Sequence, residues 1–242
     1  MTSSIPTSQR TVAAMFGRIA SGYDVANSIL SFGIDRLWRC RLVKGVEVAF
    51  APGSRRRILD LAAGTYDVSL ALVRTIPGAT VLAADFCLPM LQAGKGKLGA
   101  AGAYAQRRIT PLAGDGLGLP LKDACVDAVT VSFGLRNMRP RERALAEVYR
   151  VLVPGGFFHV LEFGSAKGRI WGGLYNLYLT RVLPFVGGFV TGDKDAYEYL
   201  ARTITDFPEA SLLTAELYHA GFREVVGHKF WGGIVYLHVG KK

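Results

Sequence analysis

The feature of this sequence that most constrains its fold is an alternation that starts near residue 57. Short runs of β-branched or apolar residues alternate there with segments whose apolar residues recur at helical spacing. Such alternation is typical of βαβ units, in which helices cover both faces of a mostly parallel sheet, and it predicts an α/β, Rossmann-like fold. The expected strands cover residues 58–62, 80–84, 109–113, 127–132, 157–162, 224–229 and 234–239, and the expected helices cover 68–75, 88–98, 141–151 and 211–220.

Turn-forming residues mark several boundaries of these elements. Pro154-Gly155-Gly156 is expected to stop the helix at 141–151, and Ser211 is expected to cap the start of the last helix. Trp231-Gly232-Gly233, between the last two strands, suits a hairpin and is too short for a parallel crossover. An antiparallel strand is therefore expected at the edge of an otherwise parallel, seven-stranded sheet.

Two segments stand outside the alternation. Residues 1–56 are expected to form a helical N-terminal arm or cap. Residues 165–207 are expected to form a helical lid inserted into the domain of residues 57–242.

Composition excludes several classes of protein. Half of the 242 residues are hydrophobic, which is too many for a disordered chain and enough for a sizeable core. Cys40, Cys87 and Cys125 lie far apart and lack the spacing of zinc ligands, so a disulfide scaffold is excluded and a reducing, cytoplasmic compartment is expected. The four histidines also lack the spacing of metal ligands, and no metal site is expected. The polar start does not suit a signal peptide, and residues 170–190 are too interrupted for a membrane-spanning helix.

The formal net charge of +10 is concentrated near the N-terminus. Residues 1–57 hold nine Lys or Arg against three Asp or Glu, whereas the remaining residues hold 20 against 16. A basic surface suits nucleic acid, anionic lipid or an anionic substrate, and it also occurs as a solvated face without a partner. Charge alone does not choose among these readings.

Acidic residues lie at the ends of three expected strands, where ligands bind in an open α/β sheet. Asp60 begins a run of small residues that includes Gly64 and leads into a helix N-terminus, which favours close approach of an anionic ligand. Asp85 is placed to accept hydrogen bonds from ribose hydroxyls, and Asp115, followed by Gly116, suits the amino group of an adenine. Together they predict a nucleoside site. The run does not match G-x-G-x-x-G, which disfavours a dinucleotide enzyme.

These strand ends resemble those of the class I S-adenosylmethionine-dependent methyltransferases. The matching residues are Asp60-x-Ala62-x-Gly64-Thr65, Asp85, Asp115 and Pro154-Gly155-Gly156. The run Ser132-Phe133-Gly134-Leu135-Arg136-Asn137 is similar to the signature of the ubiquinone/menaquinone biosynthesis C-methyltransferases. Further runs similar to that family are Phe16-x5-Gly22-Tyr23-Asp24-x2-Asn27, Tyr149-Arg150-Val151-Leu152-x-Pro154-Gly155-Gly156, Leu161-Glu162-Phe163, Tyr197-x-Tyr199-Leu200 and Ala220-Gly221-Phe222. The resemblance covers residues 12–241.

The resemblance implies a Rossmann-like class I methyltransferase that uses S-adenosyl-L-methionine to methylate a ring carbon of a polyprenylated quinol. The implied substrates are demethylmenaquinol, 2-polyprenyl-6-methoxybenzoquinol, or both, and we favour menaquinone biosynthesis. The resemblance also implies which residues contact the cofactor: Thr65, Asp85, Asp115 with Gly116, and Ser132.

The substrate hydroxyl must lose its proton, because a quinolate pushes electron density onto the attacking carbon. We expect Arg136 and Asn137 to serve this step: the guanidinium stabilises the developing oxyanion, and a water held by both residues carries the proton. Tyr23, delivered by the arm, is a further candidate for a hydrogen bond to the substrate. The structural alternatives are a salt bridge for Arg136 and a packed core position for Tyr23.

One position departs from the family pattern. Family members usually read Gly-Thr-Gly-Asp in the first loop, but this chain reads Gly64-Thr65-Tyr66-Asp67. A tyrosine there adopts a positive φ less readily than glycine. Its side chain either turns away and leaves cofactor binding intact, or blocks the methionine end of the cofactor. We expect the first outcome.

The substrate's isoprenoid tail needs an apolar sleeve, which both extra segments can supply. Apolar residues of the insertion are Ile170, Trp171, Leu174, Tyr175, Leu177, Tyr178, Leu179, Val182, Leu183 and Phe185; those of the arm are Ile29, Leu30, Phe32, Ile34, Leu37 and Trp38. Basic residues of the arm are Arg36, Arg39, Arg41 and Lys44. An apolar face flanked by basic residues suits either peripheral docking on an anionic membrane, here the inner face of the cell membrane, or an ordinary cap over the sheet. A homodimer is left open.

Two other functions compete with quinol methylation. A nucleic-acid methyltransferase would use the basic surface, but Ser132-Phe133-Gly134 lacks the Asn/Asp-Pro-Pro-aromatic motif common in methylation of base amino groups, and no nucleic-acid partner is expected. A non-catalytic scaffold of a quinone-synthesis complex would follow if Tyr66 abolished cofactor binding.

Overall fold

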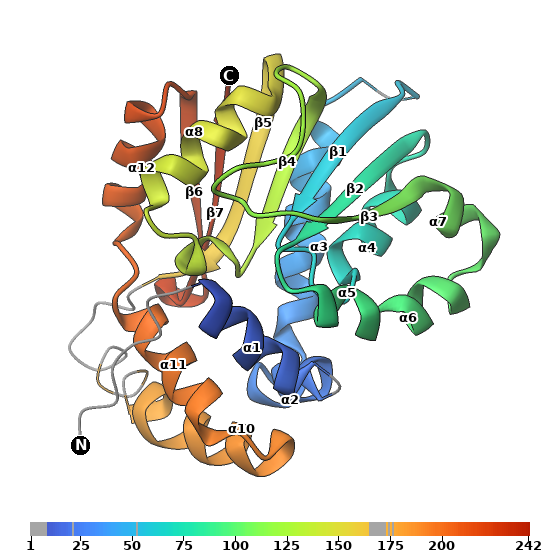
Figure 1. Ribbon diagram of the computed structural model, residues 1–242. Coiled ribbons are helices and arrows are strands. Elements are labelled where there is room, and N and C mark those ends of the chain that lie inside the picture. The colour runs from blue at the N-terminus through green and yellow to red at the C-terminus, as the bar shows by residue number, and fades with distance from the viewer. Residues whose placement is uncertain (1–8, 21, 52, 165–172, 174, 176) are drawn as a thin grey trace.

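A seven-stranded sheet forms the centre of the protein in this computed structural model, which describes residues 9–20, 22–51, 53–164, 173, 175 and 177–242. The strand order is β3-β2-β1-β4-β5-β7-β6 (Figure 1). The strands are β1 (Arg56–Leu61), β2 (Ala79–Asp85), β3 (Ile109–Ala113), β4 (Val126–Ser132), β5 (Leu152–Phe163), β6 (Arg223–Phe230) and β7 (Val235–Lys241). The order reverses between β1 and β4, so their carboxyl ends flank the crevice where α/β sheets bind ligands.

The antiparallel strand is β7, as predicted, but it does not lie at the edge. It pairs antiparallel with both β5 and β6, so β6 is the edge strand and runs parallel to β5. Burial explains the order: Val235 and Leu237 of β7 are buried, whereas most residues of β6 are exposed. The more polar strand thus occupies the edge, and the apolar strand is covered on both sides.

Helices cover both faces of the sheet. On one face α3 (Ile34–Val48), α4 (Asp67–Thr75) and α7 (Gly102–Arg108) share a buried core with the strands, and on the other face α8 (Arg141–Val151) and α12 (Ala210–His219) do so. The expected helix at 88–98 is divided at Gly94 into α5 (Leu88–Ala93) and α6 (Lys95–Ala100). Ser211 is not an N-cap, because α12 already begins at Ala210.

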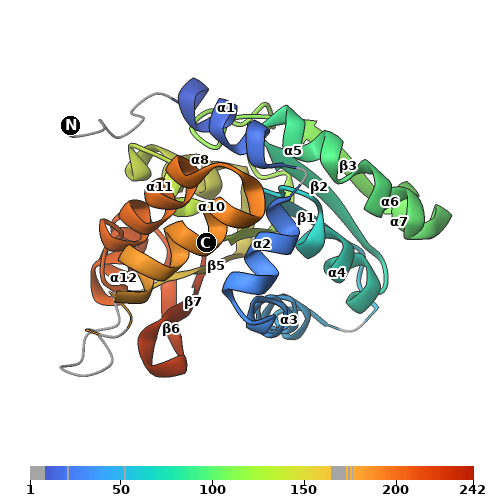
Figure 2. The ribbon, with the colours of Figure 1, turned by 90° about the horizontal axis from the view of Figure 1, so that it is seen from below.

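The arm and the insertion meet in a third core at the carboxyl ends of the strands. Its buried residues come from the arm helices α1 (Gln9–Ile19) and α2 (Tyr23–Leu30) and from three elements of the insertion. Those elements are a π-helical turn (Tyr178–Val182), α10 (Leu183–Thr191) and α11 (Lys194–Thr205). Figures 1 and 2 show this helical cap on one end of the sheet, with α2 beside α10. Ile170, Trp171 and Leu174 of the expected sleeve lie outside the described residues.

Among the described residues, no helix combines the length and the apolar character needed to cross a bilayer.

Candidate active site

A cavity of about 710 Å³ lies between the sheet and the helical cap. Its walls come from the loop after β1, the segment after β4, the arm helices α2 and α3, and the insertion. Several predicted site residues line it: Tyr23, Asp60, Gly64, Thr65, Ser132, Arg136 and Asn137. The fold therefore brings residues separated by more than a hundred positions into one space.

Two buried carboxylates shape the loop after β1. The carboxylate of Asp60 accepts hydrogen bonds from Ser69 Oγ at 2.6 Å and Thr130 Oγ1 at 3.0 Å, and burial raises its pKa to about 6. Asp85 accepts from the backbone N–H groups of Gly64 and Cys87, each at 2.8 Å, and burial raises its pKa. Asp60 therefore ties β1 to β4 and α4. Each oxygen of Asp85 accepts one backbone hydrogen bond and keeps a second lone pair, but Asp85 is not among the residues that line the main cavity.

Tyr66 points into the core and not into the cavity. Its backbone is left-handed (φ 70°), its side chain is fully buried, and its hydroxyl donates to the Leu91 carbonyl oxygen at 2.8 Å. Gly94 gives the ring its space, because a Cβ at Gly94 would lie 2.6 Å from the ring. The expectation that the side chain turns away from the cofactor loop is confirmed. A glycine at position 94 therefore leaves room for the tyrosine at position 66.

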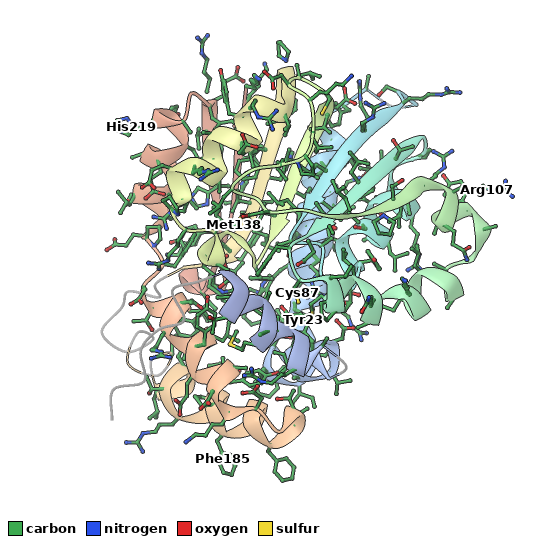
Figure 3. The ribbon with its side chains drawn as sticks, viewed as in Figure 1. Tyr23, Cys87, Arg107, Met138, Phe185 and His219 are labelled. Atoms are coloured by element: carbon green, nitrogen blue, oxygen red, sulfur yellow. The ribbon has the colours of Figure 1, made fainter. Side chains whose placement is uncertain are left out.

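Asp115 and Gly116 line a second, much smaller pocket of about 20 Å³ beside the main cavity. Met138, which is also labelled in Figure 3, forms part of its wall. Ala62 and Asn137 line both spaces, so the two adjoin at these residues. The predicted adenine end and the predicted reacting end are therefore neighbours in the fold.

Arg136 is held in a buried ion pair. Its Nη1 lies 2.7 Å from Glu162 Oε1 and also donates to the Phe133 carbonyl oxygen. Only 3% of the Arg136 side chain and 1% of the Glu162 side chain are exposed. The salt-bridge alternative is thus real, but the pair lies at the cavity and not at an edge of the sheet. Glu162 balances the guanidinium charge, which makes burial of the pair tolerable.

Asn137 is oriented by a residue of α11. Tyr199 of α11 donates its hydroxyl hydrogen to Asn137 Oδ1 at 3.1 Å. This bond leaves the amide nitrogen as the donor that faces other partners. Tyr23 lines the cavity at the start of α2, and its ring packs edge-on against Phe16 at 6.0 Å. Tyr23 therefore packs against a neighbouring ring and also borders the cavity.

Several buried polar atoms around the cavity have no hydrogen-bond partner among the residues that the structure describes. They belong to residues that line the cavity: Trp38 Nε1, Ser132 Oγ, Arg136 Nε and Tyr175 Oη. Buried polar groups are normally paired, so such a group of atoms marks a place where a polar ligand is expected. Tyr175 and Trp38 were assigned only to the apolar sleeve. Unlike the aliphatic residues of the sleeve, Tyr175 and Trp38 carry a hydroxyl and an indole N–H, and these polar groups were the feature of the sequence that pointed to hydrogen bonding.

The sequence model of the ubiE/COQ5 methyltransferase family matches residues 4–242, nearly the whole chain. The chain belongs to this family. Among curated relatives, a demethylmenaquinone methyltransferase of Thermus thermophilus is 43% identical over 94% of this chain and 100% of the relative. Proteins of the same name from Mycobacterium bovis (40% identical; 96% of this chain, 93% of the relative) and Streptomyces avermitilis (42%; 96% and 94%) are also similar.

Solved structures show the same fold at low identity. A SAM-dependent methyltransferase from Thermotoga maritima has a TM-score of 0.62 at 19% identity, covering 95% of this chain and 99% of the other. One from Aquifex aeolicus has a TM-score of 0.58 at 16% identity, covering 82% and 88%. The Rossmann-like methyltransferase fold is confirmed, and the family makes this chain a methyltransferase.

The residues present fit S-adenosylmethionine, the cofactor that the sequence resemblance implies. Tyr66 leaves the loop after β1 unobstructed, Ser132 Oγ is buried without a partner, and Asp85 keeps acceptor capacity. Asp115 lies beside the adjoining small pocket.

Proposed function

We propose that this methyltransferase transfers a methyl group to the ring carbon of demethylmenaquinol in menaquinone biosynthesis. The names of its relatives support this substrate. The observation that carries the proposal is the lining of the cavity, which is mostly apolar, includes the buried polar side chain of Arg136, and includes exposed aromatic residues such as Phe32 and Trp231. A polar quinol ring attached to a long isoprenoid tail has this pattern of polarity.

Arg136, Asn137 and Tyr175 are the polar residues that we assign to the quinol ring. The bound cofactor supplies an activated methyl group, so the protein's task is to hold the ring carbon in line and to help the hydroxyl lose its proton. Arg136 is a poor base because guanidinium does not release its proton, but its unpartnered Nε–H suits a developing oxyanion. Asn137, oriented by Tyr199, positions a water that carries the proton away.

Tyr175 extends this set. Its buried hydroxyl has no partner among the described residues, and its pKa is raised by burial, with Arg136 acting in the opposite direction. The hydroxyl therefore remains protonated at neutral pH and acts as a hydrogen-bond donor to the quinol oxygen. We assign it a positioning role beside Arg136.

The mouth of the cavity docks on the membrane that contains the substrate, at its inner face. Phe32, between α2 and α3, and Trp231, between β6 and β7, line the cavity and yet are 83% and 57% exposed. Phe185 and Phe189 of α10 are exposed as well, and Figure 3 shows Phe185 pointing away from the protein at the outer end of the cap. Exposed aromatic side chains of this kind insert into the headgroup region of a bilayer.

Purified protein given S-adenosylmethionine and short-chain quinols tests the proposal. We expect methylated product from demethylmenaquinol, and the same assay with the benzoquinol shows whether that substrate is also used. Arg136→Lys should lower kcat by about tenfold to a thousandfold, and Tyr175→Phe should lower it by about tenfold. Both variants should retain the affinity for S-adenosylhomocysteine.

Tyr104→Phe is the matched control, since Tyr104 is exposed on α7, away from the cavity. Cofactor binding without methylation of either quinol would contradict the proposed substrate. Absence of both cofactor binding and methylation would favour the non-catalytic scaffold. Methylation of RNA in place of quinol would favour the nucleic-acid reading.

A further inference from the structure

Arg39 of α3 faces the cavity and not the basic surface of the arm to which its sequence position assigned it. Its Nη1 lies 2.7 Å from Asp67 Oδ2 and 3.1 Å from Asp35 Oδ2, and its side chain is 17% exposed. Arg36 and Arg41 on the same helix are exposed. The structure therefore removes Arg39 from the proposed membrane surface.

Arg39 belongs to a charged cluster that joins four elements. Lys97 of α6 places Nζ 2.6 Å from Asp24 Oδ2 and 2.6 Å from Asp67 Oδ1. Asp24 of α2 also accepts a hydrogen bond of 2.7 Å from Thr65 Oγ1, in the loop after β1. The cluster thus links α2, α3, α4 and α6 beside the loop after β1.

The cluster has a net charge of −1, because its three carboxylates exceed its two cations by one. Its cavity-lining members are Asp24, Asp35, Arg39 and Asp67, whereas Lys97 is not part of the lining. The amino-acid end of S-adenosylmethionine carries an ammonium, a carboxylate and a sulfonium, a net charge of +1. The carboxylate of the ligand therefore has a cationic partner and its ammonium has anionic partners. The net charge of −1 on the cluster also complements the net charge of +1 on the ligand.

Trp38 adds an independent observation. It precedes Arg39 in α3, lines the same cavity and is more than nine-tenths buried, yet its indole N–H has no acceptor among the described residues. An indole N–H can only donate, so its missing partner is an acceptor such as a carboxylate.

We propose that Arg39 and Trp38 bind the carboxylate, and Asp24 and Asp67 the ammonium, of the amino-acid end of S-adenosylmethionine. This inference rests on the proposed cofactor and adds arm residues to its binding site. Lys97 is a positioning residue, since it contacts Asp24, Asp67 and Thr65 but not the cavity. The helical arm therefore does more than cover the substrate: it completes the cofactor site.

Calorimetric titration with two ligands tests this assignment. S-adenosylhomocysteine carries the amino-acid end, whereas 5′-methylthioadenosine lacks it but keeps the nucleoside. Arg39→Gln should weaken the affinity for S-adenosylhomocysteine by about tenfold and leave that for 5′-methylthioadenosine within about twofold of the wild type. Arg41→Gln, which removes the same charge from an exposed position of α3, should change neither affinity.

Asp24→Asn provides a second variant in case Arg39→Gln does not fold, and it should show the same ligand selectivity. Equal weakening of both ligands, or no change in either, would overturn the inference and leave the cluster as a structural tie between arm and sheet. A wild-type protein that binds neither ligand would instead contradict the proposed function itself.

Discussion

At the scale of single residues, side-chain direction decides whether a position belongs to the site. Tyr66 replaces a glycine of the family pattern, yet its ring is in the core against Gly94. Arg136 was predicted from its sequence motif, whereas its partner Glu162 and the unpaired hydroxyl of Tyr175 emerged only from the packed structure. The local sequence indicates which residues are candidates for the site, but the direction of each side chain depends on neighbours from distant segments.

Tyr66→Gly tests the conclusion that this side chain is structural. Removing a buried aromatic ring costs about 3–5 kcal/mol, and relief of the positive φ returns about 1 kcal/mol, so the free energy of unfolding should fall by about 3 kcal/mol. Affinity for S-adenosylhomocysteine should stay within about threefold of the wild type. Urea unfolding and calorimetry measure the two quantities.

Tyr66→Phe is the control, because it keeps the ring and removes only the hydrogen bond to Leu91, at a cost of about 1 kcal/mol. Cofactor binding by the Tyr66→Gly variant but not by the wild type would show that the ring obstructs the site.

At the scale of elements, periodicity located most strands and helices within a few residues, because amphipathic patterns are local. It did not order β6 and β7, since a hairpin can present either of its strands to a neighbour. Periodicity also did not predict which apolar residues of the insertion are buried. Its apolar residues divide between the third core, which buries Leu179 and Leu183, and the exposed face of α10.

The exposed face of α10 should contribute to membrane binding. Phe185→Ser with Phe189→Ser should reduce the fraction of protein that sediments with vesicles containing anionic lipid by about tenfold, because two aromatic anchors are lost. Leu212→Ser, at an exposed position of α12, is the matched control and should bind as the wild type does. Equal sedimentation of all three proteins would exclude this surface.

At the scale of the whole molecule, the arm, the sheet with its loops and the insertion together form one cavity. Their assembly decides which charged residues are exposed and which are buried. Arg39 serves the inner cluster, and Lys44 pairs with Glu47, so the exposed basic surface of the arm is smaller than its composition suggested. The sheet also buries a histidine beneath α3: His159 of β5 is fully buried, and its ring lies against Gly45.

His159 should make the fold sensitive to acid. Burial lowers its pKa from an ordinary 6.5 to about 4, so below pH 6.5 the unfolded chain takes up a proton that the folded chain excludes. The free energy of unfolding should therefore fall as the pH drops, by about 2 kcal/mol between pH 7.5 and pH 5 from this residue. Asp60, with its pKa raised to about 6, opposes part of the loss, since the folded chain gains its proton first.

Urea unfolding of His159→Gln at several pH values isolates the effect, because the variant should lose less stability than the wild type over this range. His219→Gln, at an exposed position of α12, should keep the wild-type pH dependence. Parallel pH profiles for His159→Gln and the wild type would refute the assignment.

The amino-acid sequence alone determined the α/β class, the succession of strands, the acidic strand ends and the family signature from Ser132 to Asn137. Periodicity, strand order along the chain and short motifs are all local properties, which is why they could be read without coordinates. Only the tertiary structure decided that β7 lies inside the sheet, that Tyr66 turns into the core, that Glu162 pairs with Arg136 and that Arg39 turns toward the cofactor loop. Each of these depends on packing and charge pairing between residues distant in the chain, which no local pattern encodes.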